Sequence, residues 1–175
     1  MKDLFDPLMI MAYIFPAYAT NGAPVIFVRL VKNPHPLDGG TLFLDGKRIL
    51  GDGKTLEGLI SGLIAGIIAG FVLTLLQAFL YRCFLEFVLL CIGAIVGDIF
   101  GSFIKRRIGI KRGGAAPILD QLGFLFFSIA TAWSVMGPPI WVNELSIIFL
   151  IFLTFFLHLG TNAAAYLIGL KERWY

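Results

Sequence analysis

The chain has 175 residues, of which 58% are hydrophobic and only 14% are charged. Soluble domains carry about 25% charged residues, well above the share in this chain, and the mean hydropathy of the chain is +0.88. The composition therefore excludes an ordinary soluble globular protein. Fourteen Lys and Arg residues against eleven Asp and Glu residues leave a net charge of only +3. An excess this small, set in apolar sequence, argues against a nucleic-acid-binding protein.

Five segments are nearly free of charge, and each is long enough to cross a membrane as a helix, which needs about 20 apolar residues. In chain order they cover residues 7–28, 57–81, 85–104, 118–137 and 143–170. The sequence therefore predicts an all-α polytopic membrane protein, with a single transmembrane domain over residues 1–175 built as a bundle of five helices. A cleaved signal peptide fits the first segment less well, because residues 1–6 hold one Lys and two Asp where a signal needs net positive charge.

Basic residues predict the orientation, because they concentrate on the cytoplasmic side of membrane proteins. Twelve of the fourteen Lys and Arg residues fall in residues 29–56, in residues 105–117 or after the fifth helix, and only Lys2 and Arg82 lie opposite. We therefore expect the N-terminus outside, the C-terminus in the cytoplasm, and two cytoplasmic loops at 29–56 and 105–117. The expected location is the cell membrane, as a multi-pass protein whose functional site, in the two charged loops, faces the cytoplasm.

The first two predicted helices each carry an irregular feature. Asn21 lies three residues before Pro24, and this proline removes a backbone donor and frees carbonyl groups near the cytoplasmic end. A kinked structural helix and a polar cavity lined by Asn21 both fit. The second helix has glycines at strict four-residue spacing, at positions 58, 62, 66 and 70. This spacing predicts close helix packing, either within the bundle or between two subunits of a homodimer.

The long loop ends in the sequence Gly51-Asp52-Gly53-Lys54-Thr55, just before the second helix. Its Gly-Lys-Thr resembles a P-loop, but position 48 is Arg where that motif requires Gly, and no strand precedes it. What remains is a set of glycines, a lysine and a helix N-terminus, which together suit an anion. Phosphate or metal binding and an ordinary solvated loop both fit this composition. Candidate ligands here are Asp52 for a metal and Gly53, Lys54 and Thr55 for substrate.

Two carboxylates interrupt the apolar pattern of the third and fourth helices. Asp98 precedes the cytoplasmic end of one, and Asp120 follows the start of the next, so both lie at similar depth. A lone carboxylate at the bilayer centre costs about 2.5 to 3.5 kcal/mol, so each needs a partner. A structural salt bridge is one interpretation. Another is metal binding, because Asp98 shares a helix face with Ser102, Lys105 and Arg106, and this stripe suits a polyphosphate bound to Mg²⁺.

Residues 102–123 read S-F-I-K-R-R-I-G-I-K-R-G-G-A-A-P-I-L-D-Q-L-G. This segment resembles the signature of the membrane cytidylyltransferases that make CDP-diacylglycerol. Arg112 stands where that family has Asp, Gln121 replaces an Arg, and Gly123 stands where the last acid would be. The compact five-helix form resembles the archaeal branch, the CDP-archaeol synthases, over nearly the whole chain. The matching positions of the signature are Ser102, Lys105, Arg106, Lys111, Gly113, Gly114 and Asp120.

The resemblance implies transfer of CMP from CTP to an isoprenoid ether-linked glycerol phosphate lipid, with Mg²⁺ as cofactor and pyrophosphate as the second product. The implied partners are CTP, the lipid in the bilayer and the membrane itself. Asp98, Lys105 and Asp120 are the expected catalytic residues, and Asp98, Asp120 and Asp52 the expected metal ligands. The expected substrate-binding residues are Asn21, Gly53, Lys54, Thr55, Ser102, Arg106, Lys111, Arg112, Gly113 and Gln121.

Two other function classes fit less well. CDP-alcohol phosphotransferases also open their motif with Asp and Gly, but their following Ala-Arg and their two further Asp at four-residue spacing are missing here. A small membrane transporter or channel with a cytoplasmic-side ion site would place Asp98 and Asp120 along a pathway. The candidate polar groups lie toward the cytoplasmic half, which favours a one-sided pocket over a path through the membrane.

Overall fold

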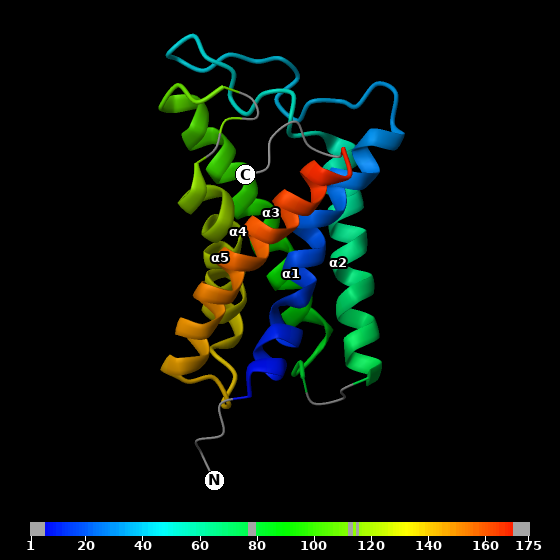
Figure 1. The fold of residues 1–175 in the computed structure, drawn as a ribbon, viewed down its shortest axis with the longest axis vertical. Coiled ribbons are helices and arrows are strands. Elements are labelled where there is room, and N and C mark those ends of the chain that lie inside the picture. Colours follow the sequence, from blue (N-terminus) through cyan, green and yellow to red (C-terminus); the bar gives the residue numbers. More distant parts are fainter. Residues whose placement is uncertain (1–5, 77–79, 112–113, 115, 170–175) are drawn as a thin grey trace.

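The computed structural model describes residues 6–76, 80–111, 114 and 116–169, and these residues form five long helices (Figure 1). Each helix is long and apolar enough to cross a membrane. In the described part of the chain the connections contain two isolated β-bridges but no strand. The prediction of an all-helical protein with five helices long and apolar enough to span a membrane is confirmed. The helices are α1 (Pro7–Phe27), α2 (Leu56–Leu76), α3 (Phe84–Arg107), α4 (Pro117–Met136) and α5 (Glu144–Leu167), with a 3-10 turn η1 (Val28–Leu30) after α1.

Most helix ends differ from the prediction by one or more residues, and two of these differences have a physical reason. The second span was expected to reach residue 81, but Leu80 and Tyr81 are not helical and are buried against the bundle. The Tyr81 hydroxyl donates to the carbonyl oxygens of Ala12 and Tyr13, at 3.0 and 3.1 Å. These apolar residues are covered by protein rather than by lipid, a difference that hydropathy does not record. α3 continues to Arg107 instead of ending at residue 104, because cations are favourable in the last turn of a helix.

Glycines bring the helices together in two close pairs. All four glycines of the α2 ladder are buried, and at Gly62 a Cβ atom would lie only 2.5 Å from the Thr20 carbonyl oxygen of α1. α3 approaches α4 in the same way, since a Cβ at Gly97 would lie 2.6 Å from the Gly123 carbonyl oxygen. The ladder therefore serves packing within the bundle, which is one of the two predicted alternatives.

A buried carboxylate fixes the end of the bundle opposite the long loop. Glu86, which is 1% exposed, accepts hydrogen bonds from the Tyr13 hydroxyl at 2.9 Å and from the Arg82 guanidinium at 2.6 Å. Arg82 also donates to the Gly137 carbonyl oxygen, at 2.7 Å, in the connection between α4 and α5. This network ties α1, α3 and that connection together, and hydropathy gives no sign of it because Glu86 lies at the edge of a span.

Candidate active site

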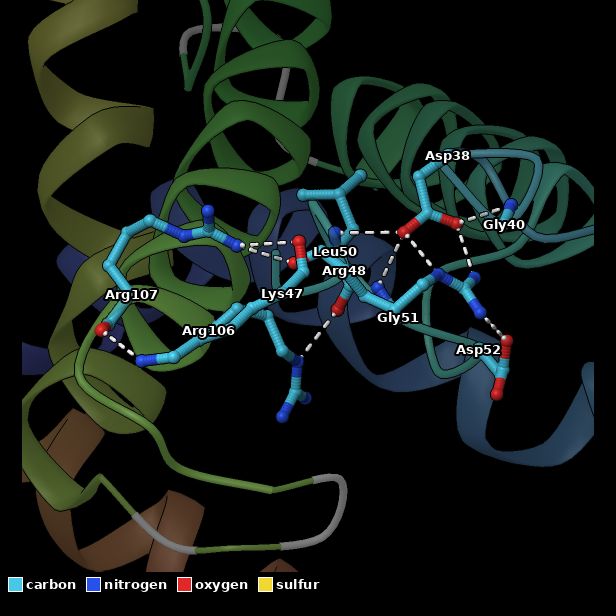
Figure 2. Close-up of polar contacts among 9 residues, drawn as sticks. All are labelled: Asp38, Gly40, Lys47, Arg48, Leu50, Gly51, Asp52, Arg106 and Arg107. Carbon is cyan, nitrogen blue, oxygen red and sulfur yellow. Dashed lines mark hydrogen bonds and ion pairs between the residues drawn. The ribbon is translucent and has the colours of Figure 1, made fainter. Parts of the chain in front are cut away.

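The two loops lie at the same end of the bundle (Figure 1), and both contact the end of α3. Lys47 of the long loop donates from Nζ to the Arg107 carbonyl oxygen, at 2.9 Å, and Arg106 donates from Nε to the Leu50 carbonyl oxygen, at 3.0 Å (Figure 2). The long loop therefore lies directly over the helix that carries Asp98, the first of the two intramembrane carboxylates.

Each of these two carboxylates is paired with a lysine. Lys54 Nζ lies 2.5 Å from Asp98 Oδ2, and Lys105 Nζ lies 2.9 Å from both carboxylate oxygens of Asp120. Asp120 also accepts a hydrogen bond from the backbone N–H of Ala116, at 3.0 Å. The two aspartate side chains remain 41% and 33% exposed. The lysines supply the partners that the sequence required, and both carboxylates stay accessible to a ligand.

The loop that carries Lys54 is organised around Asp38, whose side chain is 1% exposed. This carboxylate accepts hydrogen bonds from the Arg48 guanidinium, at 2.5 and 3.1 Å, and from the backbone N–H groups of Leu50 and Gly51, at 2.9 and 2.8 Å (Figure 2). The Arg48 hydrogen bonds hold the pKa of Asp38 well below its usual range, and the backbone donors act in the same direction. Asp38 is a structural residue that the sequence analysis did not select.

Replacing Asp38 by Asn is expected to lower the stability of the protein by about 1 to 3 kcal/mol at neutral pH, because the Arg48 partner and two backbone donors lose a charged acceptor. The folded-state pKa of Asp38 lies below its unfolded value, so this stabilisation is complete above about pH 4 and is lost as the pH falls through the folded-state pKa. Thermal unfolding in detergent should show a lower Tm for the variant at pH 7 and a difference that narrows below about pH 4. Equal Tm values at pH 7 would contradict the role given to Asp38.

Arg106 connects the loop to the helix and also contacts a turn that contains a glycine with positive φ. Its guanidinium donates to the carbonyl oxygens of Leu50 and Ile110. Gly51 lies against it with φ of +88°, and a Cβ there would be 3.2 Å from Arg106 Nε. Glycine is favoured at this position because L side chains rarely adopt a positive φ. In the structure the predicted substrate-binding Arg106 therefore holds the 50–51 turn against the end of α3.

The remaining predicted substrate-binding residues differ in their surroundings. Thr55 caps α2, since its hydroxyl accepts the Gly58 N–H at 3.1 Å. Ser102 and Gln121 are buried, and the Gln121 Oε1 atom has no hydrogen-bond partner among the described residues. Asn21 is half-buried, whereas Gly53 and Lys111 are exposed. The two predicted residues Arg112 and Gly113 lie outside the described residues.

The carboxylates near the loops could bind a metal only together with further ligands, which the phosphates of a nucleotide would supply. Among the residues that the structure describes, no three His, Cys, Asp or Glu side chains come close enough to hold a metal together. Asp52, the third predicted ligand, is 55% exposed and pairs with Arg48 at 2.8 Å. Mg²⁺ is usually bound by one or two carboxylates together with substrate phosphates and water. Asp98 and Asp120 fit that mode of binding, in which the metal arrives with its nucleotide.

Comparisons with known proteins place the chain in one family. A family model described as CDP-archaeol synthase, CarS-like, matches residues 1–175. The CDP-archaeol synthase of Thermococcus onnurineus is 42% identical over 164 residues, which cover 91% of this chain and 92% of the relative. The enzyme of the same name from Methanothermobacter thermautotrophicus is 42% identical over 174 residues, which cover 99% of this chain and 96% of the relative.

A solved structure is also similar. It is described as "Structural insight into an intramembrane enzyme for archaeal membrane lipids biosynthesis". It superposes with a TM-score of 0.77 at 35% sequence identity, and the match covers 90% of this chain and 94% of the other.

Proposed function

This chain belongs to the CDP-archaeol synthase family and is a membrane cytidylyltransferase of archaeal lipid synthesis. We propose that it transfers CMP from CTP to an isoprenoid ether-linked glycerol phosphate, and that this reaction takes place at the end of the bundle where the long loop meets α3. The observation that carries the placement is the pair of lysine–aspartate contacts, Lys54 with Asp98 and Lys105 with Asp120. Positive and negative groups alternate there, as binding of a metal-complexed triphosphate requires.

The proposed reaction is an in-line displacement at the α-phosphorus of CTP. An oxygen of the lipid phosphate forms a bond to that phosphorus, and the bond from the phosphorus to the bridging oxygen of the β-phosphate breaks, so pyrophosphate leaves with the electron pair. A phosphate monoester dianion is already nucleophilic near neutral pH, so no general base is needed. The protein contributes mainly by positioning the two substrates and neutralising their charge.

We assign the neutralisation of phosphate charge to two lysines and the binding of Mg²⁺ to two aspartates. Lys54 and Lys105 would exchange their carboxylate partners for phosphate oxygens of CTP, and Asp98 and Asp120 would then hold Mg²⁺. Bound there, Mg²⁺ would neutralise phosphate charge and align the reacting groups. Lys111 and Arg106 are further candidates for phosphate contacts, because Lys111 is exposed and Arg106 lies beside the loop that carries Lys54.

We further propose that this end of the bundle faces the cytoplasm, where CTP is available, with the N-terminus outside and residues 1–175 acting as one catalytic domain in the cell membrane. The positive-inside distribution of basic residues supports this orientation. A homodimer stays a prediction from the sequence, and the α2 glycine ladder does not support it because those glycines pack against α1 and α3.

The function is tested by pyrophosphate release from purified protein in detergent with CTP and Mg²⁺. We expect release only when a glycerol phosphate lipid is added, with the ether-linked isoprenoid lipid preferred over an ester-linked one. Chelation of Mg²⁺ by EDTA should stop the release, and added Mg²⁺ should restore it. Folded protein that is silent with both lipids, but moves ions across liposomes, would replace this function by the transporter alternative.

The substitution Lys105→Ala is expected to raise the KM for CTP by about tenfold or more, because a hydrogen bond to a charged group contributes about 1.5 to 3 kcal/mol. Lys47→Ala is the matched control: Lys47 lies at the same end of the bundle, but its Nζ donates to the Arg107 carbonyl oxygen and contacts no carboxylate in the described residues. Steady-state kinetics with varied CTP should separate the two variants. If Lys105→Ala and Lys47→Ala had the same KM for CTP, Lys105 would only anchor the helix at the membrane surface.

A further inference from the structure

The long loop contains a short hairpin, residues 41–49, whose turn exposes three consecutive apolar side chains. The hairpin is regular: Phe43 N–H donates to the Lys47 carbonyl oxygen at 2.8 Å, and Gly46 closes the turn with φ of +73°. Leu42, Phe43 and Leu44, which we term the apolar tip, are 59%, 40% and 97% exposed. Exposed apolar patches outside a membrane span mark contact surfaces, so the apolar tip requires a partner.

The contacts of Phe43 with α3 place this residue of the apolar tip near the level of the membrane boundary. The Phe43 and Phe103 rings meet edge to face with their centroids 5.4 Å apart. α3 has 24 residues, a length of about 36 Å at 1.5 Å per residue, and the hydrocarbon core is about 30 Å thick. The last turn of α3, which includes Arg107, therefore reaches the headgroup layer, and Phe103 lies one turn deeper.

The hairpin is fastened to the helix at this depth. The Arg107 guanidinium carbon lies 4.7 Å from the centre of the Phe43 ring and 5.0 Å from that of Phe103. Arg107 also pairs with Asp45, at 2.6 Å, and Lys47 Nζ donates to its carbonyl oxygen at 2.9 Å. Figure 2 shows the contacts between Arg107 and Lys47. These contacts from two directions prevent the hairpin from lifting away from the end of α3.

We propose that the apolar tip inserts into the boundary between headgroups and hydrocarbon on the loop side of the membrane, so that the hairpin is an interfacial anchor. A lipid surface is favoured over a protein partner because Phe43 continues, through Phe103, the apolar surface of a membrane-spanning helix. The anchor holds the hairpin against the membrane surface, whereas the contact between Lys54 and Asp98 is made by a separate part of the same loop. Apolar side chains flanked by cations are typical of segments that lie in this interface.

The proposal is tested by the accessibility of a spin label in phosphatidylcholine liposomes, without substrate or turnover. The label is placed by Leu44→Cys in a Cys83→Ser protein, since Cys83 is exposed and Cys91 is buried. Electron paramagnetic resonance should show more collisions with oxygen, which partitions into lipid, than with a water-soluble nickel chelate. Asn33→Cys, at an exposed position of the same loop, should show the opposite ratio.

Each other outcome overturns the proposal. A label at Leu44 that reacts to the nickel chelate as the Asn33 label does would place the apolar tip in water. A label protected from both agents, with spin–spin broadening that grows with protein concentration, would show that a second copy of the chain covers the tip. Because no CTP or lipid substrate is present, these results are independent of whether the proposed function is correct.

A second variant needs no label. Leu42→Ser combined with Leu44→Ser changes side chains that are mostly exposed, so the fold should persist. We expect faster amide hydrogen exchange of residues 38–54 in liposomes and unchanged exchange in α3 and α4. Unchanged exchange in the loop would show that the apolar tip does not anchor it.

Discussion

Asp98→Asn is expected to reduce turnover by about 100-fold or more while leaving the Tm nearly unchanged. Loss of one electrostatic contact to a reacting group typically costs about 10² to 10³ in kcat, and Asp98 is assigned both a metal and the Lys54 partner. The Asp98 side chain is 41% exposed, so loss of its ion pair should cost no more than about 1 kcal/mol of stability. Pyrophosphate release and thermal unfolding, measured on the same preparation, test both parts.

Asp45→Asn is the matched control for this prediction. Asp45 is also an aspartate at the loop end of the bundle, is 35% exposed, and forms an ion pair at 2.6 Å, but its partner is Arg107 rather than a lysine of the candidate site. We expect near-normal turnover from Asp45→Asn. Residual turnover in Asp98→Asn together with a collapse of its Tm would identify the Lys54–Asp98 pair as a structural salt bridge.

The sequence predicts the five helices because hydropathy measures what a membrane requires, and it predicts that Asp98 and Asp120 need partners because an isolated charge in lipid is costly. It does not predict which lysine pairs with which aspartate. Lys105 is 15 residues from Asp120, but Lys54 is 44 residues from Asp98. The second contact exists only because the long loop folds back over α3, and no local pattern encodes that path.

The sequence also does not predict which individual charged side chains are buried. Asp38 occupies a loop rich in charged residues, where a solvated carboxylate is the ordinary expectation, yet its side chain is 1% exposed because backbone N–H groups of the same loop converge on it. Glu86 lies at the start of a predicted span and is buried by Tyr13 and Arg82. Both depend on groups brought together by the fold, so spacing and composition alone could not identify them.

Gly66→Ala is expected to destabilise the protein by about 3 kcal/mol or more, at the upper end of the cost of overpacking a core. The added Cβ would lie 2.0 Å from the Thr20 hydroxyl oxygen, 2.7 Å from Cys91 Sγ and 2.8 Å from the Pro16 carbonyl oxygen. The hydroxyl and the thiol can rotate away, but the carbonyl oxygen belongs to the backbone of α1. α2 therefore has to move away from α1, and the Tm in detergent should fall markedly.

The control is Gly160→Ala in α5, where a Cβ would meet nothing within 4 Å. Alanine is favoured over glycine inside a helix by about 0.5 to 1 kcal/mol, so this variant should unfold at the same temperature as the parent or higher. Similar Tm values for the two alanine variants would show that α1 and α2 do not pack through Gly66.

A displaced α2 also has a functional consequence, because Lys54 lies two residues before this helix begins and reaches Asp98 from there. Gly66→Ala should therefore raise the KM for CTP as well, although its methyl group lies three helical turns away from Lys54.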